Sequence, residues 1–287
     1  MKILALGDFH GQFPKKFYKI IKKEHPDIIV SNGDYMTFSL RKIFVKRVYV
    51  NQEEVQLWDI IGKKKYKEAL AKDLRAGEKV LKILNRLKIP VVTITGNVDQ
   101  TKWREAIDEP YYEKSRENWK WLDQDFLGDM IKKYKNIRCV DYSHSKFNGY
   151  TFIGWPKSSF PGRVKSKNYK KIKKQMERLF NKFRKENKEK KLVFVAHNGP
   201  YNTRLDLIKS KEAHKKAKGK HYGAKLTRRL IDKYQPFLTI CGHIHEGMGM
   251  QKLGKTLVIN TGSAHEGKAA IITLPENKGK IKVKFIK

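Results

Sequence analysis

Five short apolar runs in this chain end in the same way, in a group of aspartate, asparagine or histidine beside a glycine. Short apolar runs bounded by glycine are typical of buried strands. In open α/β sheets, ligands bind beyond the carboxyl ends of the strands. The pattern therefore predicts an α/β fold whose strand ends converge on one polar site. The runs are residues 2–6, 27–30, 91–95, 192–196 and 237–241, and the polar groups are Asp8 with His10, Asp34, Asn97, His197, and His243 with His245.

The spacing within these groups favours a metal site. Side chains two positions apart on extended backbone point the same way, so Asp8 and His10 can face one point. His243 and His245 have the same spacing. Carboxylates and imidazoles that converge on one point are metal ligands. An isolated Asp-x-His is equally compatible with a solvated loop, but chance is a poor explanation for all seven residues together.

The rest of the chain is read as part of the same unit. The 287 residues are enough for one large domain or two small ones, and no internal repeat is visible; we expect residues 1–287 to form a single domain. Two lysine-rich segments, 157–191 and 204–220, are expected to be basic helical or loop insertions, the first of them with an amphipathic helix. Periodicity predicts helices over 14–24, 53–87, 102–135 and 223–234, and further strands over 256–260, 269–274 and 281–286.

Two hairpins are also expected. The Asn148-Gly149 dipeptide is a strong turn signal, and it would join strands at 136–140 and 150–154. Residues 43–45 and 48–50 could pair as a second hairpin. The aromatic side chains of the 102–135 segment are expected to pack in the protein rather than to stack on bases; they are Trp103, Trp119, Trp121 and Phe126.

The charge of the chain is far from balanced, with 64 Lys and Arg residues against 29 Asp and Glu and a net charge of +35. Such an excess attracts polyanions over long distances, so a nucleotide or nucleic acid is a possible partner. A solvated basic surface explains the charge equally well, because no RNA-recognition, KH or zinc-finger signature accompanies it.

The apolar segments and the cysteines indicate in which compartment of the cell we expect the protein. No stretch approaches the roughly 18 apolar residues of a membrane span, and the apolar N-terminal run is too short for a signal peptide. We therefore expect a soluble, cytoplasmic protein with no membrane partner. Cys139 and Cys241 lie far apart and outside any Cys-x-x-Cys pair, which predicts two reduced thiols in the core.

The motifs follow one another in a specific order. Gly-Asp-x-His from Gly7 is followed by Gly-Asp, Gly-Asn-x-Asp, a single histidine, and Gly-His-x-His ending at His245. This order resembles that of the calcineurin-like metallophosphoesterases, and Asn260-Thr261-Gly262-Ser263 is similar to the closing loop of that family. Residues 196–202, 221–223 and 242–246 are similar to a branch related to cyclic-nucleotide phosphodiesterases. The resemblance covers nearly the whole chain.

The resemblance implies a four-layer α/β/β/α sandwich of two mixed β-sheets flanked by helices, with two divalent metal ions between the sheets. It assigns Asp8, His10 and His245 to the first metal, Asn97, His197 and His243 to the second, and Asp34 to a bridging position. Imidazole with carboxylate and amide oxygen suits manganese, which we expect, or iron, zinc, nickel or cobalt, but not calcium. Two ions about 3.5–4 Å apart can share a hydroxide that attacks a phosphoryl group, so no protein nucleophile is needed.

One position departs from the family pattern. Many relatives have Gly-Asn-His-Asp or Gly-Asn-His-Glu, and that histidine is assigned to the transition state or the leaving group, whereas this chain has Val98. General-acid help is worth about 10²- to 10⁴-fold. We therefore expect slow turnover of poor leaving groups, or a substitute acid. His221 is our catalytic candidate and His144 a second one, for which a plain loop position is the simpler interpretation. His25, His214 and His265 are expected to be structural or solvated.

Two classes of function fit these observations. The first is a binuclear metal-dependent phosphodiesterase acting on a nucleotide or a nucleic-acid-like substrate, with a phosphomonoesterase as the rival inside the class. The second is a nucleic-acid-binding or scaffold protein on the same fold with a weak centre. Val98 and the charge favour the second class, and the complete ligand set disfavours it.

Overall fold

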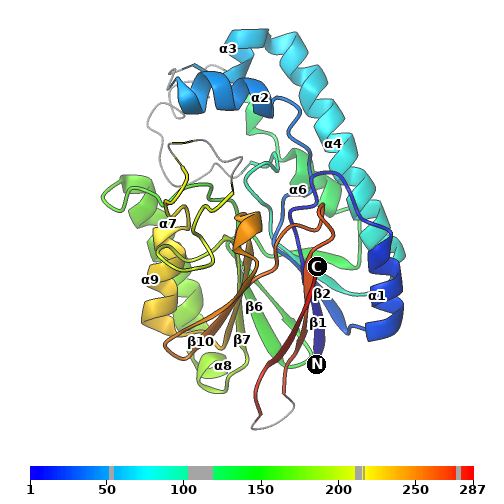
Figure 1. Cartoon of the computed structure of the whole chain (residues 1–287), viewed down its shortest axis with the longest axis vertical. Helices are drawn as coiled ribbons and strands as arrows, with labels where there is room; N and C mark the ends of the chain where they lie inside the picture. Colours follow the sequence, from blue (N-terminus) through cyan, green and yellow to red (C-terminus); the bar gives the residue numbers. More distant parts are fainter. Residues whose placement is uncertain (52–54, 103–118, 211–214, 216, 276–278) are drawn as a thin grey trace.

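The computed structural model describes residues 1–51, 55–102, 119–210, 215, 217–275 and 279–287. Two six-stranded mixed sheets lie face to face, and helices cover both outer faces (Figure 1). This is the predicted four-layer α/β/β/α sandwich.

The first sheet consists of β1 (Lys2–Leu6), β2 (Ile28–Ser31), β3 (Val91–Thr93), β4 (Ile137–Cys139), β11 (Ala269–Thr273) and β12 (Lys282–Ile286). Its order is β12-β11-β1-β2-β3-β4. Strands β1 to β4 are parallel, while β11 and β12 are antiparallel additions beside β1. Burial on both faces explains the continuous apolar sequence of β1 and β2.

The second sheet consists of β5 (His144–Phe147), β6 (Tyr150–Trp155), β7 (Leu192–Asn198), β8 (Leu238–Gly242), β9 (Gly249–Leu253) and β10 (Thr256–Asn260). Its order is β5-β6-β7-β8-β10-β9. The four inner strands are parallel, and β5 and β9 are antiparallel edge strands. The sequence did not predict β9, whose residues alternate between partly buried and exposed up to the buried Leu253, and which covers one edge.

Alternate side chains along the strands face two different parts of the core, one between the sheets and one under the helices. Ile3 and Ala5 of β1 face the second sheet, whereas Leu4 and Leu6 face the helices. The helices α1 (Lys16–Glu24), α4 (Lys63–Arg86) and α6 (Phe126–Ile131) cover the first sheet. The helices α7 (Lys167–Lys182) and α9 (Lys225–Tyr234) cover the second (Figure 1). Shorter helices are α2 (Arg41–Ile43), η1 (Phe44–Val50), α3 (Leu57–Ile61), η2 (Lys120–Asp123), α8 (Arg184–Lys188) and η3 (His245–Gly247).

The basic segment 157–191 contains the predicted amphipathic helix. In α7 the apolar face, which includes Ile172, Met176 and Phe180, is buried against the second sheet, and its lysines lie on the other face. The segment 204–220 contains no helix among its described residues, which exclude 211–214 and 216. None of the helices in the described part of the chain is long and apolar enough to cross a bilayer.

The predicted hairpin over 43–50 is wrong, because these residues are helical. The short α2 continues into η1, a π-helix. The N–H groups of Phe44 and Asn51 bond locally to the carbonyls of Leu40 and Lys46. A two-residue hairpin needs glycine or asparagine in its turn, and Lys46-Arg47 provides neither. The β-branched residues on either side suggested strands that the turn could not join.

The second hairpin forms with a different partner strand. Asn148 and Gly149 both have positive φ, at 48° and 78°, as a type I′ turn requires. This turn pairs the residues that flank it, Phe147 with Tyr150, so β5 is the partner of β6. The segment expected to pair there instead forms β4, parallel to β3 in the first sheet.

The expected helix over 102–135 is only partly described, because residues 103–118 lie outside the described residues, with Trp103 among them. The remainder forms η2 and α6. Trp119 is 8% exposed, and its ring stacks on Trp121 at 5.0 Å. The prediction that these aromatic side chains pack in the protein is confirmed for the described residues.

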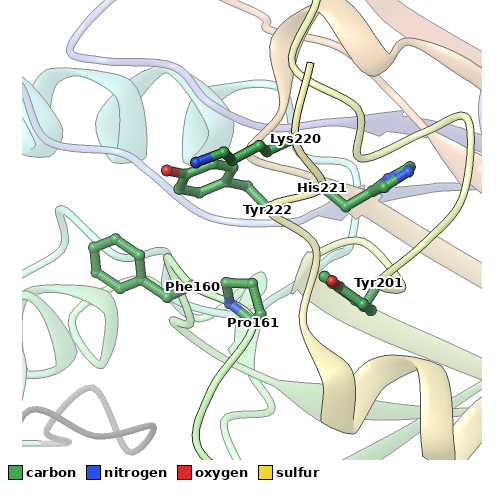
Figure 2. A pocket seen from close by; sticks show the side chains of 6 residues that line it. All are labelled: Phe160, Pro161, Tyr201, Lys220, His221 and Tyr222. Atoms are coloured by element: carbon green, nitrogen blue, oxygen red, sulfur yellow. The ribbon is translucent and has the colours of Figure 1, made fainter. Parts of the chain in front are cut away.

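The parallel strands of both sheets end at one edge of the sandwich, and their loops meet there. His243 N–H, after β8, donates to Asp8 Oδ2, after β1, at 3.0 Å. On the side of the second sheet, the loops after β6 and β7 and the segment before α9 line a cavity that is open to solvent (Figure 2). This edge holds all seven predicted ligands.

Candidate metal centre

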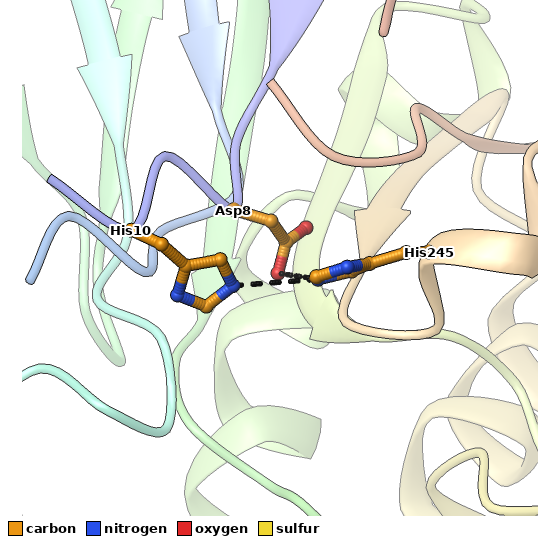
Figure 3. Close-up of side chains that lie close together, drawn as sticks. All are labelled: Asp8, His10 and His245. Carbon is orange, nitrogen blue, oxygen red and sulfur yellow. Dashed lines mark hydrogen bonds and ion pairs between the residues drawn. The ribbon is translucent and has the colours of Figure 1, made fainter. Parts of the chain in front are cut away.

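Asp8, His10 and His245 form a first group that could hold a metal ion. One ligand atom of each lies within 4.8 Å of the other two. The Nε2 atoms of His10 and His245 are 3.4 Å apart, and His245 Nε2 is 3.5 Å from Asp8 Oδ1 (Figure 3). Asp8 is fully buried, while both histidines are partly exposed. The group is therefore open to solvent on its histidine side.

Asp34, His197 and His243 form a second group with the same separation limit of 4.8 Å. His197 Nε2 lies 3.6 Å from Asp34 Oδ2 and 2.6 Å from Asn97 Oδ1. The Asn97 amide oxygen therefore adds a further donor beside this group. All seven predicted residues come together, from loops after β1, β2, β3 and β8 and from the end of β7.

The charges of Asp34 and Asp8 act on the histidines of both groups. Burial by itself would lower the pKa of His10, His197, His243 and His245, and both carboxylates oppose that effect on all four. The two groups therefore share one negatively charged environment, which favours cations.

Outer hydrogen bonds determine which ring nitrogen of the second-group histidines faces inward. His197 Nδ1 donates to the Asn32 carbonyl at 2.8 Å, which leaves Nε2 toward Asp34. His243 Nε2 donates to the Ser159 carbonyl at 3.2 Å, which leaves Nδ1 as the free ring nitrogen. Such partners fix the tautomer and orientation of metal-binding histidines. The sequence could not identify these partners, because both are backbone carbonyls from loops far away in the chain.

Glu266 is the partner of the outer ring nitrogen of His245, as the Asn32 and Ser159 carbonyls are for His197 and His243. Its Oε1 atom lies 3.3 Å from His245 Nδ1, on the side of the ring opposite the centre. The loop before it, which the sequence identified as a closing loop, contacts Asp8: Ser263 Oγ donates to the Asp8 carbonyl at 2.9 Å. One segment therefore holds two members of the first group. Nothing in the sequence pattern distinguishes Glu266 from other exposed glutamates.

Asp99 joins the loop after β2 to the loop after β3. Its Oδ2 accepts the N–H groups of Asp34 at 3.0 Å and Gly96 at 2.8 Å. Its Oδ1 accepts those of Tyr35 at 2.8 Å and Met36 at 3.1 Å. Asp99 therefore positions the backbone on which Asp34 stands.

The backbone at four of the candidate ligands is in the left-handed region, with φ of 53° at Asp8, 44° at His10, 55° at Asp34 and 66° at His243. Each such residue costs on the order of 1–3 kcal/mol, and such residues cluster at functional sites. The surrounding hydrogen bonds therefore hold these side chains in a conformation that the local sequence alone disfavours.

His243 and His245 differ in whether they are ready to bind a cation at neutral pH. Burial and the charge of His197 lower the pKa of His243 to about 4, so it is neutral at pH 7. For His245, burial lowers the pKa, but the bond to Asp8 outweighs burial and the pKa rises to about 9. The same bond, together with the neighbouring histidines, outweighs burial at Asp8 and lowers the pKa of that carboxyl. His245 must therefore lose a proton before it can bind a metal.

Val98 stands at the position of the family histidine but cannot donate a proton as that histidine would. Its N–H donates to Asp34 Oδ1 at 3.0 Å, and its side chain packs against the core under the first sheet. The backbone at this position supports the centre, but the side chain has no proton to give.

The two histidines considered as substitutes lie in different places. His221 lines the cavity of Figure 2, and its Nδ1 donates to the buried Asp206 at 2.8 Å. His144 lies on the edge strand β5, where its ring packs 4.4 Å from that of Phe183. His265, expected to be structural or solvated, is exposed, and its ring lies edge-on to His10 at 6.3 Å.

Comparison with known proteins agrees with this architecture. A family model for calcineurin-like phosphoesterases matches residues 1–247. The chain belongs to the calcineurin-like phosphoesterase family. It is 25% identical over 263 residues to the uncharacterized protein MJ1162 of Methanocaldococcus jannaschii, covering 91% of this chain and 87% of that protein.

Solved structures with the same fold cover almost all of the chain. The protein TT1561 of Thermus thermophilus aligns with 99% of this chain and 97% of its own, at 15% identity and a TM-score of 0.53. A dimetal phosphatase from Danio rerio aligns with 99% and 95%, at 11% identity and a TM-score of 0.52. At these identities the likeness shows the fold.

The donor set fits divalent transition-metal ions. Calcineurin-like phosphoesterases use divalent metals, and each group here combines a buried carboxylate with two imidazoles. In three of the four histidines an outer partner occupies the other ring nitrogen, as in known metal sites. Imidazole with carboxylate suits such ions better than calcium or magnesium.

Proposed function

We propose that this calcineurin-like phosphoesterase is a binuclear metal-dependent phosphodiesterase. The observation that carries the proposal is the meeting of two candidate metal groups at one edge of the sandwich, with the Asp34 field reaching both. The residues that would hold the ions are Asp8, His10 and His245 for one, His197, His243 and Asn97 for the other, and Asp34 for both.

When bound, two such ions supply a hydroxide nucleophile at neutral pH and neutralise charge on the phosphoryl group. Manganese is the ion we propose, with iron, zinc, nickel or cobalt as alternatives. The protein supplies the fixed geometry: the bonds from His197 to Asn32 and from His243 to Ser159 hold the imidazoles in place before any ion arrives. Such preorganisation reduces the cost of rearrangement during reaction.

His221 is our proposed proton donor to the leaving group, in place of the histidine missing at Val98. Its Nδ1–H donates a hydrogen bond to the buried Asp206 carboxylate at 2.8 Å, so the imidazolium form of His221 would give the proton that it carries on Nε2 and become neutral. Asp206 also accepts the N–H groups of Thr203 and Gly223, so its own position is well determined. A carboxylate that orients an imidazole in this way is a recurrent arrangement in general acid–base catalysis.

The charge of the protein supports a nucleotide or nucleic-acid-like substrate. The described parts of both basic segments reach the centre: Ser159 contacts His243, and the N–H groups of Lys209 and Ser210 donate to Glu246, next to His245. Lysines and arginines beside a phosphoesterase centre favour a substrate with further phosphates. A phosphomonoesterase remains the alternative.

Hydrolysis by the metal-stripped protein tests the proposal. Manganese, nickel, zinc and magnesium are added back separately, with a diester and a monoester that share a p-nitrophenyl leaving group. We expect metal-restored cleavage of the diester that Asp34→Asn abolishes. Asp129→Asn, a change at an exposed carboxylate, is the matched control and should retain the activity. A flat result with every metal would refute the proposal, and nucleic-acid binding that survives Asp34→Asn would then favour the scaffold alternative.

A further inference from the structure

A cavity of about 570 Å³ lies beside the second metal group. Ligand pockets in proteins typically measure about 300–1,000 Å³. Three segments contribute its walls: the loop after β6, the loop after β7, and the segment before α9. The lining residues are Phe160, Pro161, Tyr201, Lys220, His221 and Tyr222 (Figure 2).

The cavity adjoins the metal groups through the loop after β6. The Ser159 carbonyl accepts a hydrogen bond from His243 Nε2 at 3.2 Å, and the next residue, Phe160, lines the cavity. Tyr201 stands four positions after His197 on the adjacent strand end. A substrate whose phosphate lies at the metal groups would therefore place its organic group at the mouth of this cavity.

The walls are tied together before any ligand binds. Lys225 N–H donates to the Pro161 carbonyl at 2.9 Å, and Tyr201 N–H donates to the Ala224 carbonyl at 3.2 Å. Asn198 Nδ2 donates to the Tyr222 carbonyl at 2.8 Å. Each bond joins two of the three segments, or a segment to the strand end beside it, so the cavity is preformed.

The chemistry of the lining is aromatic with a cationic rim. Phe160, Tyr201 and Tyr222 are three of the six lining residues, and all three are partly buried. The side chains of Lys220 and Tyr222 extend to one side of their segment, facing Phe160, while His221 extends to the other (Figure 2). An acyl chain would require a continuous apolar lining, which Lys220 and His221 interrupt.

We propose that this cavity binds the nucleobase of a nucleotide ester, with the aromatic rings of Phe160 and Tyr222 as stacking surfaces and Lys220 as a partner for phosphate. Aromatic rings stack on any base, and a lysine at the rim adds affinity for the anionic backbone. The inference rests on the proposed function, because the phosphate of the nucleotide is taken to lie at the metal groups.

Two p-nitrophenyl diesters that differ only in the nucleoside test the proposal. We compare kcat/KM for thymidine 5′-(p-nitrophenyl phosphate) with that for methyl p-nitrophenyl phosphate. Stacking on one base corresponds to roughly a 5- to 150-fold preference for the thymidine ester. Tyr222→Leu should reduce this ratio toward one, whereas Tyr222→Phe, which retains the ring, should preserve it. Tyr18→Leu removes a 44%-exposed tyrosine on α1 and should leave the ratio unchanged.

Binding to the metal-stripped protein provides a readout that needs no catalysis. Adenosine monophosphate should bind roughly 5- to 150-fold more tightly than ribose 5-phosphate, and Tyr222→Leu should remove the difference. If no metal restores hydrolysis but this difference is present, the proposed function fails and the base pocket stands. If hydrolysis is restored but both esters react equally in the wild type, and the two ligands bind equally, the base pocket is refuted while the proposed function stands.

Discussion

Replacing Asp99 should separate the two loops that its carboxylate joins. Its Oδ1 accepts the N–H groups of Tyr35 and Met36, and its Oδ2 accepts those of Asp34 and Gly96. Asp99→Ala removes all of these acceptors at a fully buried position. Asp99→Asn keeps one oxygen but turns an NH₂ group toward two N–H donors.

The size of the effect follows from the number of bonds. A typical hydrogen bond contributes a net of about 0.5–1.5 kcal/mol to the free energy of unfolding, and an unpaired buried group costs more. Four lost bonds make Asp99→Ala destabilising by roughly 2–6 kcal/mol. Asp99→Asn loses two of the four and should cost about half as much. Because Asp34 N–H is among the donors, both variants should also bind metal more weakly.

Urea unfolding of the metal-free protein measures these differences. Burial and the charge of Asp34 raise the pKa of Asp99 to about 7, so the experiment is done at pH 8, where the carboxylate is ionised. Asp129→Ala, which removes a solvent-exposed ion pair with Lys132, is the control and should have little effect. A loss below about 1 kcal/mol for Asp99→Ala, or equal losses for both variants, would refute the positioning role.

Three further predictions concern the centre. Metal binding at pH 7 should release at least one proton, because the bond from His245 to Asp8 outweighs burial and raises the pKa of His245 to about 9. The affinity for metal should therefore fall as the pH drops below 9. Calorimetry that finds no proton release at pH 7 would contradict this prediction. Glu266→Gln should weaken metal binding by about 10- to 100-fold, measured by equilibrium dialysis, because it loosens the orientation of His245; unchanged affinity would exclude that role. His221→Gln should slow alkyl esters about 10²-fold more than p-nitrophenyl esters in steady-state assays, and equal slowing would argue against a proton donor.

The strand-end pattern predicted an α/β fold with a polar site at its strand ends, and the resemblance to calcineurin-like metallophosphoesterases added the four-layer sandwich. Strands buried on both faces have continuous apolar sequences, and the carboxyl ends of parallel strands share an edge. Asp8, Asp34 and Asn97 follow parallel strands of the first sheet, so they were expected to meet at one edge. His197 and His243 lie at the ends of neighbouring strands of the second sheet, and that the two edges meet was implied by the resemblance. The same reasoning failed where local composition competed with turn geometry, as at residues 43–50, where β-branched residues lie in a π-helix.

The groups that orient the histidines of the candidate metal centre could not be predicted from the sequence. The partners of His197 and His243 are main-chain carbonyls, at Asn32 and Ser159, and any residue type has a carbonyl. Glu266 is one of many glutamates until the chain places it beside His245. These contacts arise from tertiary structure, so no spacing rule identifies them.

The metal content of the protein tests the central claim most directly. The metal-stripped chain is dialysed to equilibrium against manganese, and bound metal is measured for the wild type, His10→Ala and His243→Ala. The two groups at the sheet edge predict two ions per chain for the wild type and one for each variant. One ion or none in the wild type, or two ions retained in either variant, would contradict a two-metal centre built from these residues.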